Sequence, residues 1–191
     1  MTELNPDTIV PFLGRIFAEG ASNEYLGEPV TIGEHMLQGA QLAEEAGASD
    51  EVIAAALLHD IGHFTHAFPA DAADQGIDSR HEEAGAEVLE AFFPPVVIDC
   101  VRQHVDAKRY LCATRPEYFD RLSEASILSL KLQGGPMSAE EVAEFERNPN
   151  AKEIVQVRYI DEAAKIPGKV TPGFEHYMPL LQRVIDRFSR R

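Results

Sequence analysis

The sequence predicts an all-α protein that forms one domain over residues 1–191. Helix-start and helix-stop residues divide the chain into helical segments, and no segment alternates apolar and polar residues as a half-buried strand would. The composition, 45% hydrophobic and 26% charged, is that of a soluble globular domain. A chain of 191 residues is long enough for one such domain with a sizeable core.

Three helices are expected in the first third of the chain, at about residues 6–20, 32–46 and 50–58. Asn5-Pro6 is a typical helix start. Thr31 and Glu34 have the spacing of a capping box, and Ser49 can cap the third helix. A glycine follows each of the first two helices, as is common at helix ends.

Later helices are expected at about residues 84–93, from 95 past 104, and at 122–132, 138–147, 151–164 and 177–188. Ser79 with Glu82, and Ser138 with Glu141, again have capping-box spacing. Pro94-Pro95 ends one helix and opens the next. The longest loops, 21–31, 65–78 and 165–176, are candidates for substrate-facing surface.

The net charge of −15 argues against binding to nucleic acid or to an anionic membrane, which need clustered Lys and Arg. The apolar run Val52–Leu58 is too short to span a bilayer, and no export signal is present, so we expect a cytoplasmic protein. Cys100 and Cys112 lack zinc-type spacing and are given no chemical role. Nothing indicates a protein partner.

A set of potential metal ligands lies on or beside the expected helices: His35, the doublet His59-Asp60, His104 and Asp161. Adjacent helical residues point about 100° apart, so both members of the doublet can bind metal only at a helix end, where an Asp can bridge two ions. An unpaired carboxylate directly after the apolar segment 52–58 would cost several kcal/mol of desolvation. The pattern therefore predicts a metal site.

The order of these residues resembles the HD-domain superfamily over roughly residues 30–165. His81 and His104 would supply a second ion bridged by Asp60, and such an imidazole-rich set favours transition metals over Mg²⁺ or Ca²⁺. The ligand pattern alone does not select iron. It leaves both a hydrolase and an oxygenase open.

Four segments together resemble the PhnZ-type organophosphonate oxygenases: residues 24–35 with Tyr25 and Glu28, then 57–63, 104–111 and 133–137. The resemblance implies a mixed-valent Fe(II)/Fe(III) enzyme with O2 as co-substrate. Its expected substrate is a 1-hydroxy-2-aminoethylphosphonate or the trimethylammonio analogue. Cleavage of the C–P bond would give phosphate plus glycine or glycine betaine.

The same resemblance implies roles for individual residues. The ligands of one iron would be His35, His59, Asp60 and Asp161, and those of the other Asp60, His81 and His104. Tyr25 would occupy the open position of the second iron, held by Glu28, and both would swing away when substrate arrives.

Helical spacing supports substrate contacts beside the ligands. His63 and Lys108 each follow a ligand by four residues, so each lies one turn away on the same face, where it can bind phosphonate oxygens. Ser126 is a further candidate contact, and Arg158 can orient Asp161. His66 and His176 match no ligand position.

Two other functions compete with the oxygenase. An HD phosphohydrolase acting on a nucleotide or small phosphate ester would use the same ligands without O2. A non-catalytic HD-fold binding module is disfavoured because it has no need of the complete ligand set. The choice between a primary amine and a trimethylammonium group is left open.

Overall fold

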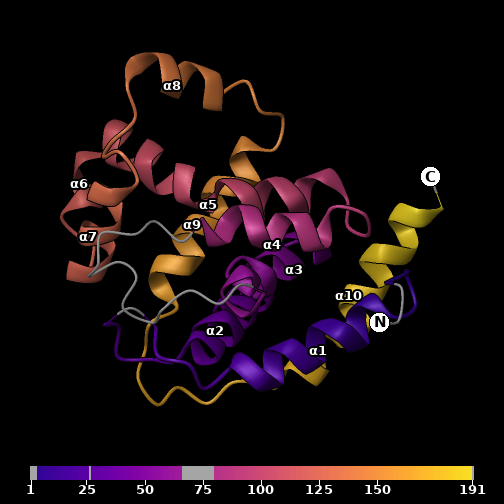
Figure 1. The fold of residues 1–191 in the computed structure, drawn as a ribbon. Coiled ribbons are helices and arrows are strands. Elements are labelled where there is room, and N and C mark those ends of the chain that lie inside the picture. Colours follow the sequence, from indigo (N-terminus) through magenta and orange to yellow (C-terminus); the bar gives the residue numbers. More distant parts are fainter. Residues whose placement is uncertain (1–3, 26, 66–79, 191) are drawn as a thin grey trace.

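The computed structural model describes residues 4–25, 27–65 and 80–190, and within these ranges it is all-α (Figure 1). Its elements in chain order are α1 (Ile9–Gly20), α2 (Ile32–Glu45), α3 (Asp50–Leu58), the 3-10 helix η1 (Ile61–Phe64), α4 (His81–Leu89), α5 (Pro95–Thr114), α6 (Pro116–Phe119), α7 (Glu124–Leu132), α8 (Ala139–Phe145), α9 (Ala151–Ala163) and α10 (Phe174–Ser189). The predicted fold class is confirmed. No helix in these ranges has the length and apolarity that crossing a membrane requires.

Helix α3 lies at the centre of the bundle because its sequence is apolar on every side. All seven residues from Val52 to Leu58 are buried, and α3 packs against α2, α5, α9 and α10. Helices α1 and α10 lie side by side on one flank, while α6, α7 and α8 lie at the opposite end (Figure 1). A second, small apolar cluster including Leu111, Tyr118 and Leu130 holds that end together.

Side-chain caps mark where four of the described helices begin, α2, α3, α7 and α8. The Thr31–Glu34 and Ser138–Glu141 capping boxes are both formed, and the Ser49 side chain caps α3, as predicted. Helix α1 begins later than expected, at Ile9, because residues 5–8 form a turn instead.

Other boundaries differ from the predictions. Helix α8 is shorter than expected, and α10 begins at Phe174 instead of 177, which shortens the loop before it. Helices η1 and α6 were not predicted, because each is a single turn and carries too few residues for a periodic pattern. Helix α4 begins at His81 after Arg80, which has a positive φ of 46°. Ser79, His66 and nearly all of the predicted 65–78 loop lie outside the described residues.

The segment between α1 and α2 forms a loop that is closed at its base. Glu24 and Thr31 form an isolated antiparallel bridge, and Ile32 N–H donates to Asn23 O at 3.0 Å. Tyr25 and Glu28 lie in the loop beyond this base, and Glu28 N–H donates to Tyr25 O at 2.7 Å. Tyr25 and Glu28 therefore lie on one short loop whose two ends are joined by main-chain pairing.

Candidate metal centre

The six predicted ligands come from different helices and meet inside the bundle. His35 lies on α2, His59 at the end of α3, Asp60 just before η1, His81 at the start of α4, His104 on α5 and Asp161 on α9. All six are buried. The fold therefore brings together residues that are up to 126 positions apart in the chain (161 − 35).

Asp60 lies between two groups of donors. Its Oδ2 is 3.6 Å from His35 Nε2 and 3.5 Å from His59 Nε2. Its Oδ1 is 3.2 Å from His81 Nε2 and 3.5 Å from His104 Nε2. The carboxylate of Asp161 joins the first group, with Oδ1 3.3 Å from His35 Nε2. Each oxygen of Asp60 therefore faces its own pair of imidazoles.

The imidazoles point their acceptor nitrogens inward. Three Nδ1 atoms contact main-chain carbonyl oxygens: His35 with Ala164 at 3.0 Å, His59 with Ala56 at 2.9 Å and His104 with Val101 at 2.8 Å. A carbonyl only accepts, so each Nδ1 carries a proton and Nε2 is the ring nitrogen that faces the centre. This arrangement is typical of metal-binding histidines, whose outward nitrogen is fixed by a hydrogen bond.

A cation between these groups would remove an otherwise unfavourable arrangement. The Nε2 atoms of His35 and His59 lie 3.0 Å apart, and those of His81 and His104 lie 3.1 Å apart. Both oxygens of Asp60 and Oδ1 of Asp161 are buried without a hydrogen-bond partner in the described part of the chain. Imidazole nitrogens this close together, beside buried carboxylate oxygens that lack hydrogen bonds, are costly without a positive charge between them. The residues fit a pair of metal ions.

Burial and neighbouring charges shift the pKa values of the candidate ligands in different directions. Against burial, hydrogen bonds to Asp161 and Asp60 raise the pKa of His35 and of His81, respectively. Burial lowers the pKa of His59 to about 4. Burial would raise the pKa of Asp60, but the surrounding imidazoles, His59 first, hold it well below its usual range. Asp161 is likewise held ionised against burial, first by Arg158. Ionised carboxylates and imidazole nitrogens together suit transition metals.

The Tyr25 ring lies directly over one predicted ligand. It stacks on His35 with ring centroids 4.5 Å apart and an interplanar angle of 20°. Burial, followed by the charge of Asp60, raises the pKa of the Tyr25 phenol well above its usual range. The aromatic ring thus closes the centre on the side of the loop between α1 and α2.

Glu28 does not hold Tyr25 through its side chain, contrary to the expectation. Its Oε1 instead accepts hydrogen bonds from Ser123 Oγ at 2.5 Å and from Lys165 Nζ at 2.9 Å. The connection to Tyr25 is the main-chain hydrogen bond at the base of the same turn. The carboxylate is drawn instead toward a lysine that sequence reasoning missed.

His63 and Lys108 both lie near the donors, as the four-residue spacing predicts. The His63 ring stacks on His81 with centroids 4.1 Å apart, and its buried Nε2 lacks a hydrogen-bond partner in the described ranges. Burial lowers the pKa of His63 to about 3. Lys108 is only 4% exposed, and burial, followed by repulsion from Arg158, lowers its pKa to about 7.

Helix α7 supplies hydroxyl groups beside two lysines, Lys108 and Lys165. Lys108 Nζ donates to Ser129 Oγ at 2.8 Å, and Ser126 Oγ accepts from Lys165 Nζ at 3.1 Å. Ser126 is buried, as a substrate contact would be. Two ammonium groups from different elements therefore meet hydroxyls one helical turn apart on α7.

Arg158 organises the far side of Asp161. Its guanidinium donates to Asp161 Oδ2, to Glu162 and, at 2.6 Å, to the Tyr118 hydroxyl. All three nitrogens of the buried guanidinium donate a hydrogen bond. Arg158 is therefore fixed in position to orient the Asp161 carboxylate, as the three-residue spacing between them suggests. Asp161 keeps Oδ1 for the metal centre.

Lys165 was missed because a lysine after a helix end has no distinctive pattern of its own. The available signal was its position four residues after Asp161, the same spacing that selected His63 and Lys108. Gln38 was also missed. Its side-chain amide donates to the main-chain oxygen of Ile166, the residue after Lys165, and accepts from the Ile166 N–H, both at 2.9 Å.

No role was predicted for His176, Cys100 or Cys112. His176 is exposed and lies 3.2 Å from Glu44. Cys100 is buried and Cys112 is partly buried, and burial raises the pKa of both thiols. Neither cysteine is placed to act as a nucleophile.

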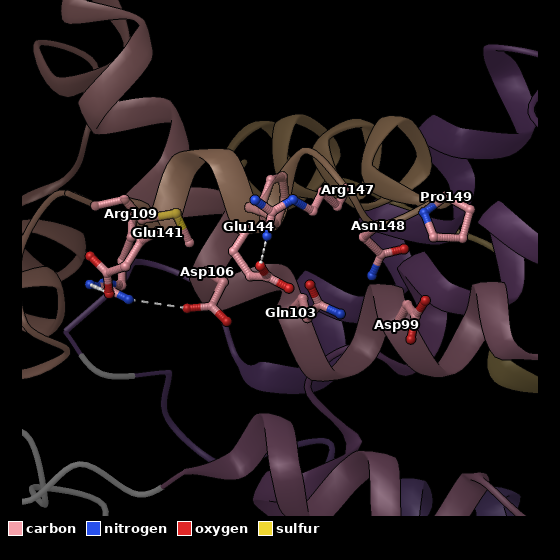
Figure 2. Close-up of a pocket in the computed structure, with 11 residues that line it drawn as sticks. Asp99, Gln103, Asp106, Arg109, Glu141, Glu144, Arg147, Asn148 and Pro149 are labelled. Carbon is pink, nitrogen blue, oxygen red and sulfur yellow. Dashed lines mark hydrogen bonds and ion pairs between the residues drawn. The ribbon is translucent and has the colours of Figure 1, made fainter. Parts of the chain in front are cut away.

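A separate open cavity of about 490 Å³ lies between α5 and α8 (Figure 2). Its charged side chains are largely engaged with one another: Arg109 pairs with Asp106 and Glu141, and Arg147 with Glu144. Phe145 and Met137 also line it. None of the predicted ligands lines this cavity.

Comparison with known proteins agrees with this geometry. A family profile described as "HD domain" matches residues 32–161, a range that begins just before His35 and ends at Asp161. The chain belongs to the HD-domain family. This HD-domain chain also has named relatives that match it over most of their length.

One relative, from Leisingera caerulea, is 62% identical over 187 residues, which cover 98% of this chain and 95% of the relative. It is named (1-hydroxy-2-(trimethylamino)ethyl)phosphonate dioxygenase (glycine-betaine-forming). A "Hydroxymethylphosphonate dioxygenase" from Gimesia maris is 44% identical, covering 80% of this chain and 77% of its own. An uncharacterised protein from Acanthamoeba polyphaga mimivirus is 34% identical, covering 93% of this chain and 80% of its own. The predicted resemblance to HD-domain phosphonate oxygenases is confirmed.

Proposed function

We propose that this HD-domain protein is a di-iron dioxygenase that cleaves the C–P bond of 1-hydroxy-2-(trimethylammonio)ethylphosphonate, with phosphate and glycine betaine as products. The observation that carries the proposal is Asp60, whose two oxygens face two separate imidazole pairs. A site for one metal would not need a carboxylate between two donor groups. The name of the relative with 62% identity supports the trimethylammonio substrate.

The two metal positions would use the residues expected from the sequence. His35, His59 and Asp161 would hold one iron and His81 and His104 the other, with Asp60 bridging them. Bound there, a redox-active iron pair would supply O2 activation. Oxidising C1 of this substrate to a carboxylate requires it, and a Lewis acid with activated water does not provide it.

The surrounding residues would bind and orient the substrate. Lys108, His63 and Ser126 would donate hydrogen bonds to the phosphonate oxygens. Tyr25 would leave its place over His35 to admit substrate and close the site against water again. Glu28, a carboxylate on the same loop, would then face the cationic end of the substrate.

The reaction balances with O2 as the only co-substrate. One oxygen atom enters the carboxylate of glycine betaine, and the other enters phosphate as the C–P bond breaks. The electrons needed to reduce O2 come from the C1–H and C–P bonds of the substrate. No external reductant is required.

The test measures phosphate release and O2 consumption by the iron-loaded protein, with and without air. The substrates are the amino and trimethylammonio 1-hydroxyphosphonates, hydroxymethylphosphonate and a phosphomonoester. We expect one phosphate and one glycine betaine per O2 from the trimethylammonio substrate and no product without air. Phosphate released from the monoester without O2 would contradict the proposal and favour the phosphohydrolase.

A pair of variants sharpens this test. The His81→Ala substitution should abolish O2-dependent phosphate release, because it removes a donor of the second metal position. His176→Ala is the matched control, since His176 is an exposed histidine paired with Glu44. Full activity in His81→Ala would overturn the two-metal assignment.

A further inference from the structure

Lys165 occupies a fixed position beside the candidate metal centre. The residue before it, Ala164, accepts the hydrogen bond from His35 Nδ1, and the residue after it, Ile166, is held on both main-chain groups by Gln38. The backbone of Lys165 is therefore anchored on both sides. Its side chain is 11% exposed and reaches inward.

The Lys165 ammonium has two kinds of partner. It donates to Glu28 Oε1 at 2.9 Å and to Ser126 Oγ at 3.1 Å, with Glu162 Oε1 farther away at 3.6 Å. Ser126 is one of the residues assigned to the phosphonate. The same ammonium thus touches both the candidate phosphonate site and the loop residue Glu28.

A second buried cation lies close by. Lys108 donates to Ser129, one turn from Ser126 on α7. Burial, followed by repulsion from Arg158 and then from Lys165, lowers the pKa of Lys108. Two lysines that repel one another around a row of hydroxyls form a site for an anion. Glu28 is the carboxylate that lies at this site in the structure, held by Lys165 and Ser123.

We propose, on the basis of the function proposed above, that Glu28 is an internal placeholder for the phosphonate and that Lys165 exchanges one anion for the other. A phosphonate dianion carries up to twice the charge of a carboxylate, so it competes favourably for two lysines. Once displaced, Glu28 is free to face the cationic amine. Lys165 thereby couples binding of the anionic end of the substrate to recognition of its cationic end, and Glu28 carries the rest of its loop with it.

The exchange makes an unusual prediction about affinity, which a double-mutant cycle can test. The probe is methylphosphonate, which has neither hydroxyl nor amine, bound anaerobically to the iron-loaded protein and followed by calorimetry. Lys165→Met should weaken binding about tenfold or more, because a charged contact is lost. Glu28→Gln should strengthen binding about threefold or more, because the competitor is removed.

The double variant separates exchange from a merely structural ion pair. In the Lys165→Met background, Glu28→Gln should no longer strengthen binding. Lys165→Arg should restore most of the affinity, and Lys152→Met, an exposed lysine on α9, should leave it unchanged. Weaker binding in Glu28→Gln, or equal strengthening in both backgrounds, would overturn the proposal.

Two further measurements keep the result interpretable. Iron content and thermal unfolding of each variant show whether the protein is folded and loaded. If the wild type fails to release phosphate from the hydroxyphosphonate but shows the affinity pattern, the proposed function fails and the exchange stands. If it turns over but lacks the pattern, the exchange fails alone.

Discussion

The two oxygens of Asp60 face different imidazole pairs, so each oxygen would bind a different metal ion. An amide at this position offers one oxygen and one NH2 group, and the NH2 cannot bind metal. Asp60→Asn should therefore lower the affinity for iron by at least about tenfold. Metal analysis after equilibration with limiting iron measures this loss, with Asp106→Asn on the surface of α5 as the control. Retention of both ions would exclude Asp60 as the bridge.

Burial of the Lys108 side chain should lower the stability of the folded protein. In the folded protein its pKa is lowered to about 7 from 10.5, chiefly by burial. Between these pH values the unfolded chain holds a proton that the folded protein has lost, so this lysine makes the free energy of unfolding rise with pH. Below about pH 7 its full cost of burial remains.

Lys108→Met should remove that pH-dependent contribution. The metal-free variant is expected to be at least as stable as wild type at pH 7, and its advantage should shrink as the pH rises toward 10. Denaturant unfolding at several pH values measures the difference. The same substitution should weaken phosphonate binding about tenfold or more. A variant that is less stable at every pH would show that the ammonium stabilises the fold.

At the scale of elements, the close approach of η1 to α4 depends on Gly62. A Cβ at this position would lie 1.9 Å from the carbonyl oxygen of His81. The contact atom belongs to the backbone of a predicted ligand, so an added methyl group must displace the start of α4. Gly62 therefore positions His81 without touching a metal.

Gly62→Ala should disturb one metal position more than the other. We expect loss of the ion on the His81 side and retention of the ion at His35, His59 and Asp161, so roughly half of the iron remains. Iron analysis with Mössbauer spectroscopy measures this. Gly14→Ala is the control, because its Cβ would meet only an ordinary contact with Phe174 at 3.6 Å. Equal loss of both ions would contradict the selective role.

The sequence was sufficient to predict elements that carry local signals. The capping boxes at Thr31 and Ser138 are determined by residues three positions apart, so they can be read from the chain alone. The two single-turn helices and the start of α4 depend on packing between segments distant in sequence. Propensity does not contain that information.

At the scale of the whole molecule, the metal centre joins the helices that make up the core. Its predicted ligands lie on or beside five α-helices, α2, α3, α4, α5 and α9, so metal binding should stabilise the entire fold. Removing iron with a chelator is expected to lower the melting temperature by about 10 °C. Scanning calorimetry tests this. The Asp60→Asn variant should show a much smaller shift; an equal one would mean that the chelator acts elsewhere.

The candidate metal ligands could be predicted from the sequence, whereas the side-chain partners of Glu28 could not. His35, His59, Asp60, His104 and Asp161 follow one another along the chain in the order that resembles the HD-domain superfamily. This set of candidate ligands could therefore be predicted from the sequence. The partners of Glu28 were not, since Ser123 and Lys165 lie 95 and 137 positions away. A contact of this range becomes visible only when the helices are placed together.

The net charge of −15 does not exclude a small anionic substrate, because the charges inside the protein differ from those of the whole chain. Asp60 and Asp161 lie inside the metal centre, and Lys108, Arg158 and Lys165 surround it, so the local charge does not follow the global one. An anionic substrate is compatible with this acidic protein.

The tied base of the loop between α1 and α2 also bears on how quickly the site can open. With Glu24 bridged to Thr31, displacement of Tyr25 and Glu28 need involve only the few residues between them. Loop motions of this size occur in nanoseconds to microseconds, whereas rearrangements of whole domains take microseconds to milliseconds. Release of Tyr25 from His35 and of Glu28 from Lys165, and not the movement of whole helices, would then set the rate of opening.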